Sequence, residues 1–280
     1  MPMPLCPAEL LTLSGADASS FAQAQFTSDV STLTPGHWQW SAWLDAQGRA
    51  RHFFLLMCVE TDRLLAWLPL GGAEAMREAL ARYVFRAKLT LSASTDWTLH
   101  ALSADELDTP LDTHAIVARA DGFAFRQPGG ENRIAWLAPS PAVDVDADAL
   151  NRWRAADVAA GLPLLAPALG GEFVPQALDL ERLDAIRFDK GCYPGQEIAA
   201  RLHFRGGNKR GLRRLRVDGA APANGTELLD AAGANAGRIL YAAPVSADAS
   251  EALAVMPIDQ PDDAGALKTA DGLGVFVITV

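Results

Sequence analysis

The chain has few cysteines and no long run of apolar residues. Its three cysteines, Cys6, Cys58 and Cys192, are odd in number and widely separated in a chain of 280 residues. This spacing argues against a disulfide framework and against a Cys-x-x-Cys metal site. The longest apolar runs, such as residues 53–59 and 64–68, are far shorter than the ~18 residues that a membrane span needs. The sequence therefore predicts no transmembrane helix and no metal bound by the chain itself.

The N-terminal residues lack the pattern of a secretion signal. Residues 1–13, MPMPLCPAELLTL, contain no basic residue and no apolar stretch that ends in a small-residue cleavage site. We therefore expect a cytoplasmic protein. With 50% hydrophobic and 21% charged residues over 280 positions, the composition is that of a globular chain of two or three domains.

Positive charge is scarce and is concentrated in one segment. The net charge is −10, yet residues 187–216 hold nine Lys or Arg against two acids, so this segment carries +7 and the remainder −17. The overall charge argues against nucleic-acid binding through the whole surface. The basic segment is either a solvated face or a site for an anionic ligand or partner.

The apolar pattern predicts an α+β fold. A helix is expected at about residues 17–27, and two aromatic-rich runs that flank Gly48 predict a β-hairpin. Strands and an amphipathic helix between residues 38 and 103 predict a split β-α-β unit. Short apolar runs separated by turn residues in 212–280 predict a small β-barrel or sandwich.

Residues 189–211, DKGCYPGQEIAARLHFRGGNKRG, stand out chemically. Glycines and a proline predict a tight turn that delivers Lys190 and Cys192 close to a helix N-terminus, which favours a thiolate or another anion. Cys192 is thus a candidate reactive thiol, and the alternative is a small buried apolar residue. Its spacing from His203 neither supports nor excludes a nucleophile and base pair. Trp153, in a predicted helix, is either a core residue or a platform for ligand stacking.

The same segment resembles the signature of the YgfZ family. The family motif, Lys-Gly-Cys-Tyr/Phe-x-Gly-Gln-Glu, is met at residues 190–197, and the opening LSGADASSFAQAQFTSDV with the LDAQGR turn is similar to the family's N-terminal part. The family shares its superfamily with the glycine-cleavage T-protein, an aminomethyltransferase. The resemblance implies a three-lobed T-protein-like architecture, with a folate-binding α+β region over 1–204 in two subdomains, one around 38–103, and a C-terminal β-barrel over 205–280.

Site residues follow from the resemblance, position by position. It implies that tetrahydrofolate or a one-carbon derivative binds in a central cavity, and that Cys192 serves as a redox or cluster-proximal thiol. A second folate-contacting tryptophan of the family falls near Ala8, and a glutamate of many relatives is Ala159 here. The implied cofactor-binding residues are Trp153, Lys190, Tyr193, Gln196, Glu197 and Arg201.

Aminomethyl transfer is not expected. The T-protein carries a catalytic aspartate just after the hairpin turn, where this chain has His52 or Phe53. The resemblance therefore implies a folate-binding protein that supports assembly or repair of iron–sulfur clusters and thereby tRNA modification, because the family's clients include tRNA-thiolating enzymes. The alternatives are a folate-dependent aminomethyltransferase or demethylase, and a module that binds tRNA directly through the basic segment.

The partners expected from this resemblance are folate and iron–sulfur client or assembly proteins, with an indirect link to tRNA-modifying enzymes. The basic segment would receive the glutamate tail of folate or an acidic partner. We expect no membrane partner and a monomer.

Overall fold

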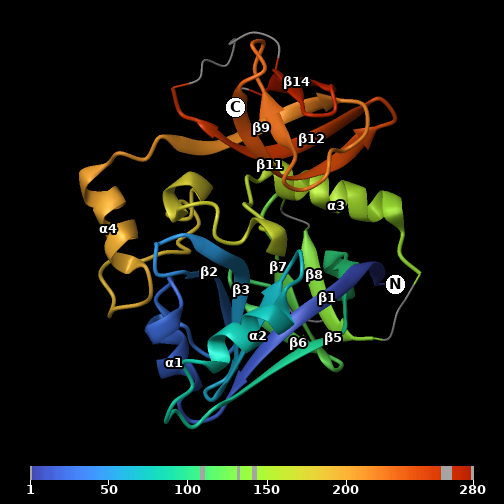
Figure 1. Ribbon diagram of the computed structural model, residues 1–280. Coiled ribbons are helices and arrows are strands. Elements are labelled where there is room, and N and C mark those ends of the chain that lie inside the picture. Colours follow the sequence, from blue (N-terminus) through green and yellow to red (C-terminus); the bar gives the residue numbers. More distant parts are fainter. Residues whose placement is uncertain (1, 108–110, 131–132, 141–143, 260–266, 279–280) are drawn as a thin grey trace.

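The computed structural model describes residues 2–107, 111–130, 133–140, 144–259 and 267–278. Within these residues the strands form an eight-stranded sheet and a six-stranded closed barrel (Figure 1). The sheet consists of β1 (Met3–Ser14), β2 (His37–Leu44), β3 (Ala50–Glu60), β4 (Arg63–Leu68), β5 (Thr90–Leu102), β6 (Ile116–Arg119), β7 (Gly122–Arg126) and β8 (Ile134–Pro139). The barrel consists of β9 (Arg210–Asp218), β10 (Glu227–Leu229), β11 (Asn235–Ser246), β12 (Ala249–Pro257), β13 (Leu267–Thr269) and β14 (Gly274–Val277). The α-helices are α1 (Ala18–Gln25), α2 (Ala73–Ala81), α3 (Ala147–Ala159) and α4 (Gln196–Arg205).

The sheet contains the split β-α-β unit that the sequence predicts for residues 38–103. Its strand order is β2-β3-β4-β1-β5-β8-β7-β6. Strands β4 and β5 both pair antiparallel with β1, so they are parallel to each other, and α2 connects them. The middle strand β1 comes from residues for which the sequence predicts no strand. Pro4 and Pro7 obscure its pattern, and a register shift between Pro4 and Cys6 accommodates the first of them.

Strand β3 is buried on both faces, which explains its continuous apolar run. Phe53, Leu55 and Met57 belong to a core that also contains α3 and the 162–199 segment. The alternate side chains, from Phe54 to Cys58, pack against α1 and α2 in a second core. Because successive strand residues point to opposite faces, a strand covered on both sides has to be apolar at every position.

The barrel is closed, in the strand order β10-β11-β12-β9-β14-β13, and it has its own apolar core. The small C-terminal β-barrel that the sequence predicts is therefore confirmed. Arg205, at which the sequence places the domain boundary, is the last residue of α4. That boundary and the subdomain division within residues 1–204 stay predictions.

Helix α3 lies between the sheet and the barrel (Figure 1). It packs against β11 and β12 on one side and against β1 on the other. The buried Tyr241 of β11 donates its hydroxyl hydrogen to the Leu162 carbonyl oxygen at 2.8 Å, just beyond the helix. Among the residues described, no helix combines the length and the apolar character needed to cross a membrane.

Candidate functional site

The motif loop packs against the β2–β3 turn through two glycines. Gly195, the N-cap of α4, has φ of 74°, and a Cβ there would collide with the Asp45 carbonyl oxygen and lie 2.7 Å from Gly48 Cα. A Cβ on Gly48, at φ of 72°, would lie 2.8 Å from Ile198 Cβ. Both positions require glycine, for backbone conformation and for space. The two segments that the sequence singles out, the DAQGR turn and the CYPGQE loop, are therefore interlocked.

Lys190 ties the motif to the segment that follows α1. Its Nζ donates hydrogen bonds to the carbonyl oxygens of Phe26 at 2.7 Å and Ser28 at 2.6 Å. Burial lowers the pKa of Lys190 from 10.5 to about 8, and the nearby Asp29 carboxylate acts in the opposite direction. The ammonium group thus already has two backbone partners, and its predicted contact with folate stays a prediction.

Four of the predicted motif residues line one hollow beside the turn. Cys192, Gln196 and Glu197 line a cavity of about 520 Å³ together with Ala46, and Tyr193 is the fourth predicted residue in its lining. The Cys192 side chain is exposed and its thiol is free. The structure therefore contradicts the buried apolar alternative for this cysteine.

Tyr193 and Arg201 have different environments. The Tyr193 ring lines the same cavity but is mostly buried, and its hydroxyl donates to the Arg187 carbonyl oxygen at 2.9 Å. Burial raises the pKa of the Tyr193 phenol. The side chain of Arg201 is exposed on α4. The motif thus combines a locked tyrosine with an accessible thiol.

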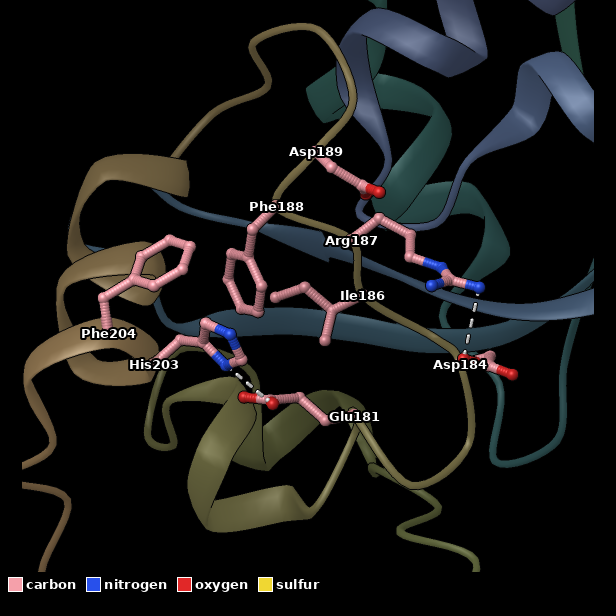
Figure 2. A pocket seen from close by; sticks show the side chains of 8 residues that line it. All are labelled: Glu181, Asp184, Ile186, Arg187, Phe188, Asp189, His203 and Phe204. Atoms are coloured by element: carbon pink, nitrogen blue, oxygen red, sulfur yellow. Dashed lines mark hydrogen bonds and ion pairs between the residues drawn. The ribbon is translucent and has the colours of Figure 1, made fainter.

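Two further cavities adjoin each other on the other side of the motif loop. We name the first the ring cavity; it measures about 540 Å³ and is shown in Figure 2. The second measures about 450 Å³ and shares Asp184, Arg187 and Asp189 with the first. The ring cavity is lined by Glu181, Asp184, Ile186, Arg187, Phe188, Asp189, His203 and Phe204.

Stacked rings and carboxylates define the chemistry of the ring cavity. Phe188 and His203 stack with ring centroids 4.4 Å apart, and the His203 Nδ1 lies 2.8 Å from a Glu181 carboxylate oxygen (Figure 2). Arg187 forms an ion pair with Asp184 at 3.4 Å. Such a cavity suits a flat ring with amino groups that donate to carboxylates.

The predicted folate residue Trp153 lies elsewhere, in a buried polar cluster under α3. In Figure 1, α4 lies at the left edge of the molecule, and α3 runs from the centre to the right, under the barrel. The Trp153 side chain is 9% exposed, and the Arg133 guanidinium covers one face of its ring at 4.2 Å from the centroid. Arg133 also forms an ion pair with Asp157 at 2.8 Å, and Gln127 donates to the same carboxylate oxygen at 2.9 Å. Trp153 lines none of the cavities described above.

Three buried polar atoms of this cluster have no hydrogen-bond partner among the residues that the structure describes. They are Trp153 Nε1, Arg133 Nε and Gln127 Oε1. Burial raises the pKa of Asp157 to about 6, although the Arg133 guanidinium acts in the opposite direction. Unpaired buried polar atoms are uncommon in folded proteins, and a bound water or ligand usually explains them. The sequence offered only one signal for this cluster, the helical spacing that places Trp153 and Asp157 on one face of α3.

The positions that differ from the T-protein pattern are buried. His52 is 8% exposed and stacks on Trp43, and burial together with Arg51 lowers its pKa to about 4. Phe53 stacks on Trp40 with centroids 4.8 Å apart. A neutral imidazole and a phenyl ring therefore occupy the two positions at which the sequence resemblance leads us to expect the T-protein aspartate to be replaced.

The residues described contain no gathering of three His, Cys, Asp or Glu side chains suited to a metal ion.

Comparison with known proteins gives both sequence relatives and a structural neighbour. The chain is 32% identical over 224 residues to the tRNA-modifying protein YgfZ of Klebsiella pneumoniae (strain 342), with 72% of this chain and 67% of the relative covered. It is 31% identical over 227 residues to the protein of the same name from Sodalis glossinidius (strain morsitans), with the same coverage. No family model matches the chain.

The crystal structure of the glycine cleavage system aminomethyltransferase T from Bartonella henselae has the same fold. It matches with a TM-score of 0.71 and 16% sequence identity, over 100% of this chain and 85% of that one. This similarity confirms the predicted T-protein-like architecture.

Proposed function

The chain belongs to the family of the tRNA-modifying protein YgfZ, and from this premise we propose that it binds a reduced folate and supports iron–sulfur cluster assembly or repair, through which it serves tRNA modification. The observation that carries the proposal is the intact motif at residues 190–197, held against the β2–β3 turn by Gly195 and Gly48. Gly195 in the loop and Gly48 in the turn have no room for a side chain, so the backbone of the loop is fixed against the turn three residues after Cys192. A reactive thiol benefits from such fixed placement.

The cluster under α3 supports the folate part of the proposal. The pterin ring of folate is flat and carries an amide-like edge with both donors and acceptors. The unpaired Trp153 Nε1 and Arg133 Nε are donors, and the unpaired Gln127 Oε1 is an acceptor, so the residues present fit that edge. The Arg133 guanidinium has to move if the pterin is to stack on the ring face that it covers. Bound tetrahydrofolate would supply a carrier for one-carbon units.

Cys192 supports the iron–sulfur part. Its thiol is exposed and lies at the rim of an open hollow of about 520 Å³. An exposed thiol can reach a cluster or a cysteine held by a client protein, whereas a buried thiol cannot. Gln196 and Glu197 beside it offer an amide and a carboxylate to the same partner.

The folate proposal is tested by calorimetric titration of tetrahydrofolate into the wild-type protein and two variants. Trp153→Phe removes the Nε1 donor, and we expect the dissociation constant to rise about tenfold, which corresponds to about 1.4 kcal/mol. Trp136→Phe is a matched control, because Arg119 covers the Trp136 ring at 4.9 Å much as Arg133 covers Trp153. We expect this control to bind as the wild type does. Absence of binding by the wild type would refute the proposal, and equal affinities for the two variants would place the folate away from Trp153.

A further inference from the structure

One face of α4 presents an exposed aromatic ring between two cations. Arg201, Phe204 and Arg205 are spaced i, i+3 and i+4, so their side chains share a face of the helix. The Phe204 side chain is 74% exposed, which is unusual for a phenylalanine. Figure 2 shows Phe204 at the opposite side of the ring cavity from Asp184. The Phe204 ring meets Phe188 and His203 edge-on, with centroids 6.2 Å and 4.7 Å apart, and its exposed remainder is open to a ligand.

The positive charge continues past the end of the helix. Gly206 and Gly207 have φ of 70° and 99°, and a Cβ on either would meet nothing within 4 Å. Lys209 and Arg210 follow at the start of β9, and both side chains are exposed. We name residues 201–210 the α4–β9 strip. Residues 201–216 hold seven Lys or Arg and no acid.

The four Lys and Arg side chains of the strip form no ion pair with a carboxylate in the part of the chain that the structure describes. No ion pair to a carboxylate is found there for Arg201, Arg205, Lys209 or Arg210, whereas Arg214 further along β9 pairs with Glu251 at 2.7 Å. Unpaired cations beside a largely exposed aromatic ring, in a chain of net charge −10, concentrate positive potential at one place. The partner that this place attracts is an anion with flat rings.

We infer that the α4–β9 strip binds single-stranded RNA, with one base stacked on Phe204 and successive phosphates contacted by Arg201, Arg205, Lys209 and Arg210. Proteins hold single strands through a positively charged groove combined with aromatic platforms. An acidic protein would also satisfy the cations, whereas a nucleic acid strand offers phosphates and flat bases at a short, regular spacing that matches cations on both sides of one ring. The exposed backbone of the two glycines gives a phosphate group room to approach the chain. This inference does not depend on folate binding.

The chain supplies its own control for the composition of the strip. After α2, Arg82, Phe85 and Arg86 also place an exposed phenylalanine between two arginines, and Phe85 is 92% exposed. This second patch lines none of the cavities described above, and Glu74 and Glu78 of α2 precede it in the sequence. If any exposed Arg-Phe-Arg surface bound RNA non-specifically, the two patches would contribute equally to RNA binding.

The test is fluorescence anisotropy with a labelled RNA oligonucleotide of unstructured sequence, measured over a series of salt concentrations. With four phosphates neutralised, the logarithm of the wild-type association constant should fall with the logarithm of salt with a slope of about −3. Phe204→Ala should raise the dissociation constant between about 5-fold and about 150-fold. Arg201→Gln combined with Arg205→Gln should make the slope shallower by about 1.4. Phe85→Ala, and Arg82→Gln combined with Arg86→Gln, should bind as the wild type does.

Each result supports or overturns the inference. Phe204 and Phe85 are both exposed, so the alanine variants keep the fold, and circular dichroism checks this. Equal losses from Phe204→Ala and Phe85→Ala would overturn the assignment of the strip. Absence of RNA binding by the wild type, with binding of polyglutamate instead, would overturn it in favour of an acidic protein partner. If the wild-type protein binds RNA but not tetrahydrofolate, the folate proposal alone would be overturned.

Discussion

Replacement of Gly195 by alanine tests the interlocking of the motif loop with the β2–β3 turn. The substitution has two costs. An L-residue at φ of 74° costs roughly 1–2 kcal/mol. The added Cβ also meets backbone atoms, the Asp45 carbonyl oxygen and Gly48 Cα at 2.7 Å, which cannot swing away as a side chain can, and overpacking of this kind costs about 1–3 kcal/mol. We therefore expect the free energy of unfolding to fall by roughly 2–5 kcal/mol.

Gly36→Ala separates the two costs. Gly36 has φ of 84°, but a Cβ there meets nothing within 4 Å, so only the conformational cost of about 1–2 kcal/mol applies. The assay is urea unfolding followed by tryptophan fluorescence, which reports on the sheet region because all seven tryptophans lie within residues 38–153. If Gly195→Ala is no less stable than Gly36→Ala, the loop and the turn do not interlock and the argument for a fixed Cys192 fails.

Three further predictions concern buried charges and the exposed thiol. Asp157→Ala leaves the buried Arg133 guanidinium without its partner and should cost about 3–5 kcal/mol of stability in urea unfolding; adding Arg133→Met should recover part of the loss, and no recovery would contradict the pairing. Burial lowers the pKa of Lys190 from 10.5 to about 8, so the unfolded chain binds more protons than the folded chain between these pH values. The free energy of unfolding of the wild type, relative to that of Lys190→Met, should therefore rise from pH 8 to pH 10. A difference that does not change with pH would contradict the lowered pKa. Thiol titration of the folded protein should show one fast cysteine, absent in Cys192→Ala, because burial raises the thiol pKa of the other two; two fast thiols would be the contrary result.

Local sequence patterns predicted those structural features that depend on residues close together in the chain. The two aromatic-rich runs that flank Gly48 indicated the β2–β3 hairpin, and Trp153 was correctly placed in a helix, α3. The motif at 190–197 was recognisable because its residues are contiguous. These features each follow from a period or a turn residue that a short window contains.

Contacts between residues far apart in the chain could not be predicted from the sequence. The Lys190 ammonium bonds to carbonyl oxygens of residues 164 and 162 positions earlier, and no local pattern encodes such a pairing. Asp157 contacts Arg133 and Gln127 across 24 and 30 positions, so the sequence linked neither of these residues to the helix that carries Trp153. Strand β1 was missed because two prolines interrupt its pattern.

The most direct test of the proposed function is complementation. A cell that lacks its own YgfZ-type protein would receive this chain or its Cys192→Ala variant, each produced at equal level, and the activity of an iron–sulfur enzyme would be measured in extracts. We predict that the wild-type chain restores the activity and that Cys192→Ala does not. Failure of the wild-type chain to restore it would contradict the proposed function, and full restoration by Cys192→Ala would contradict the role of the thiol.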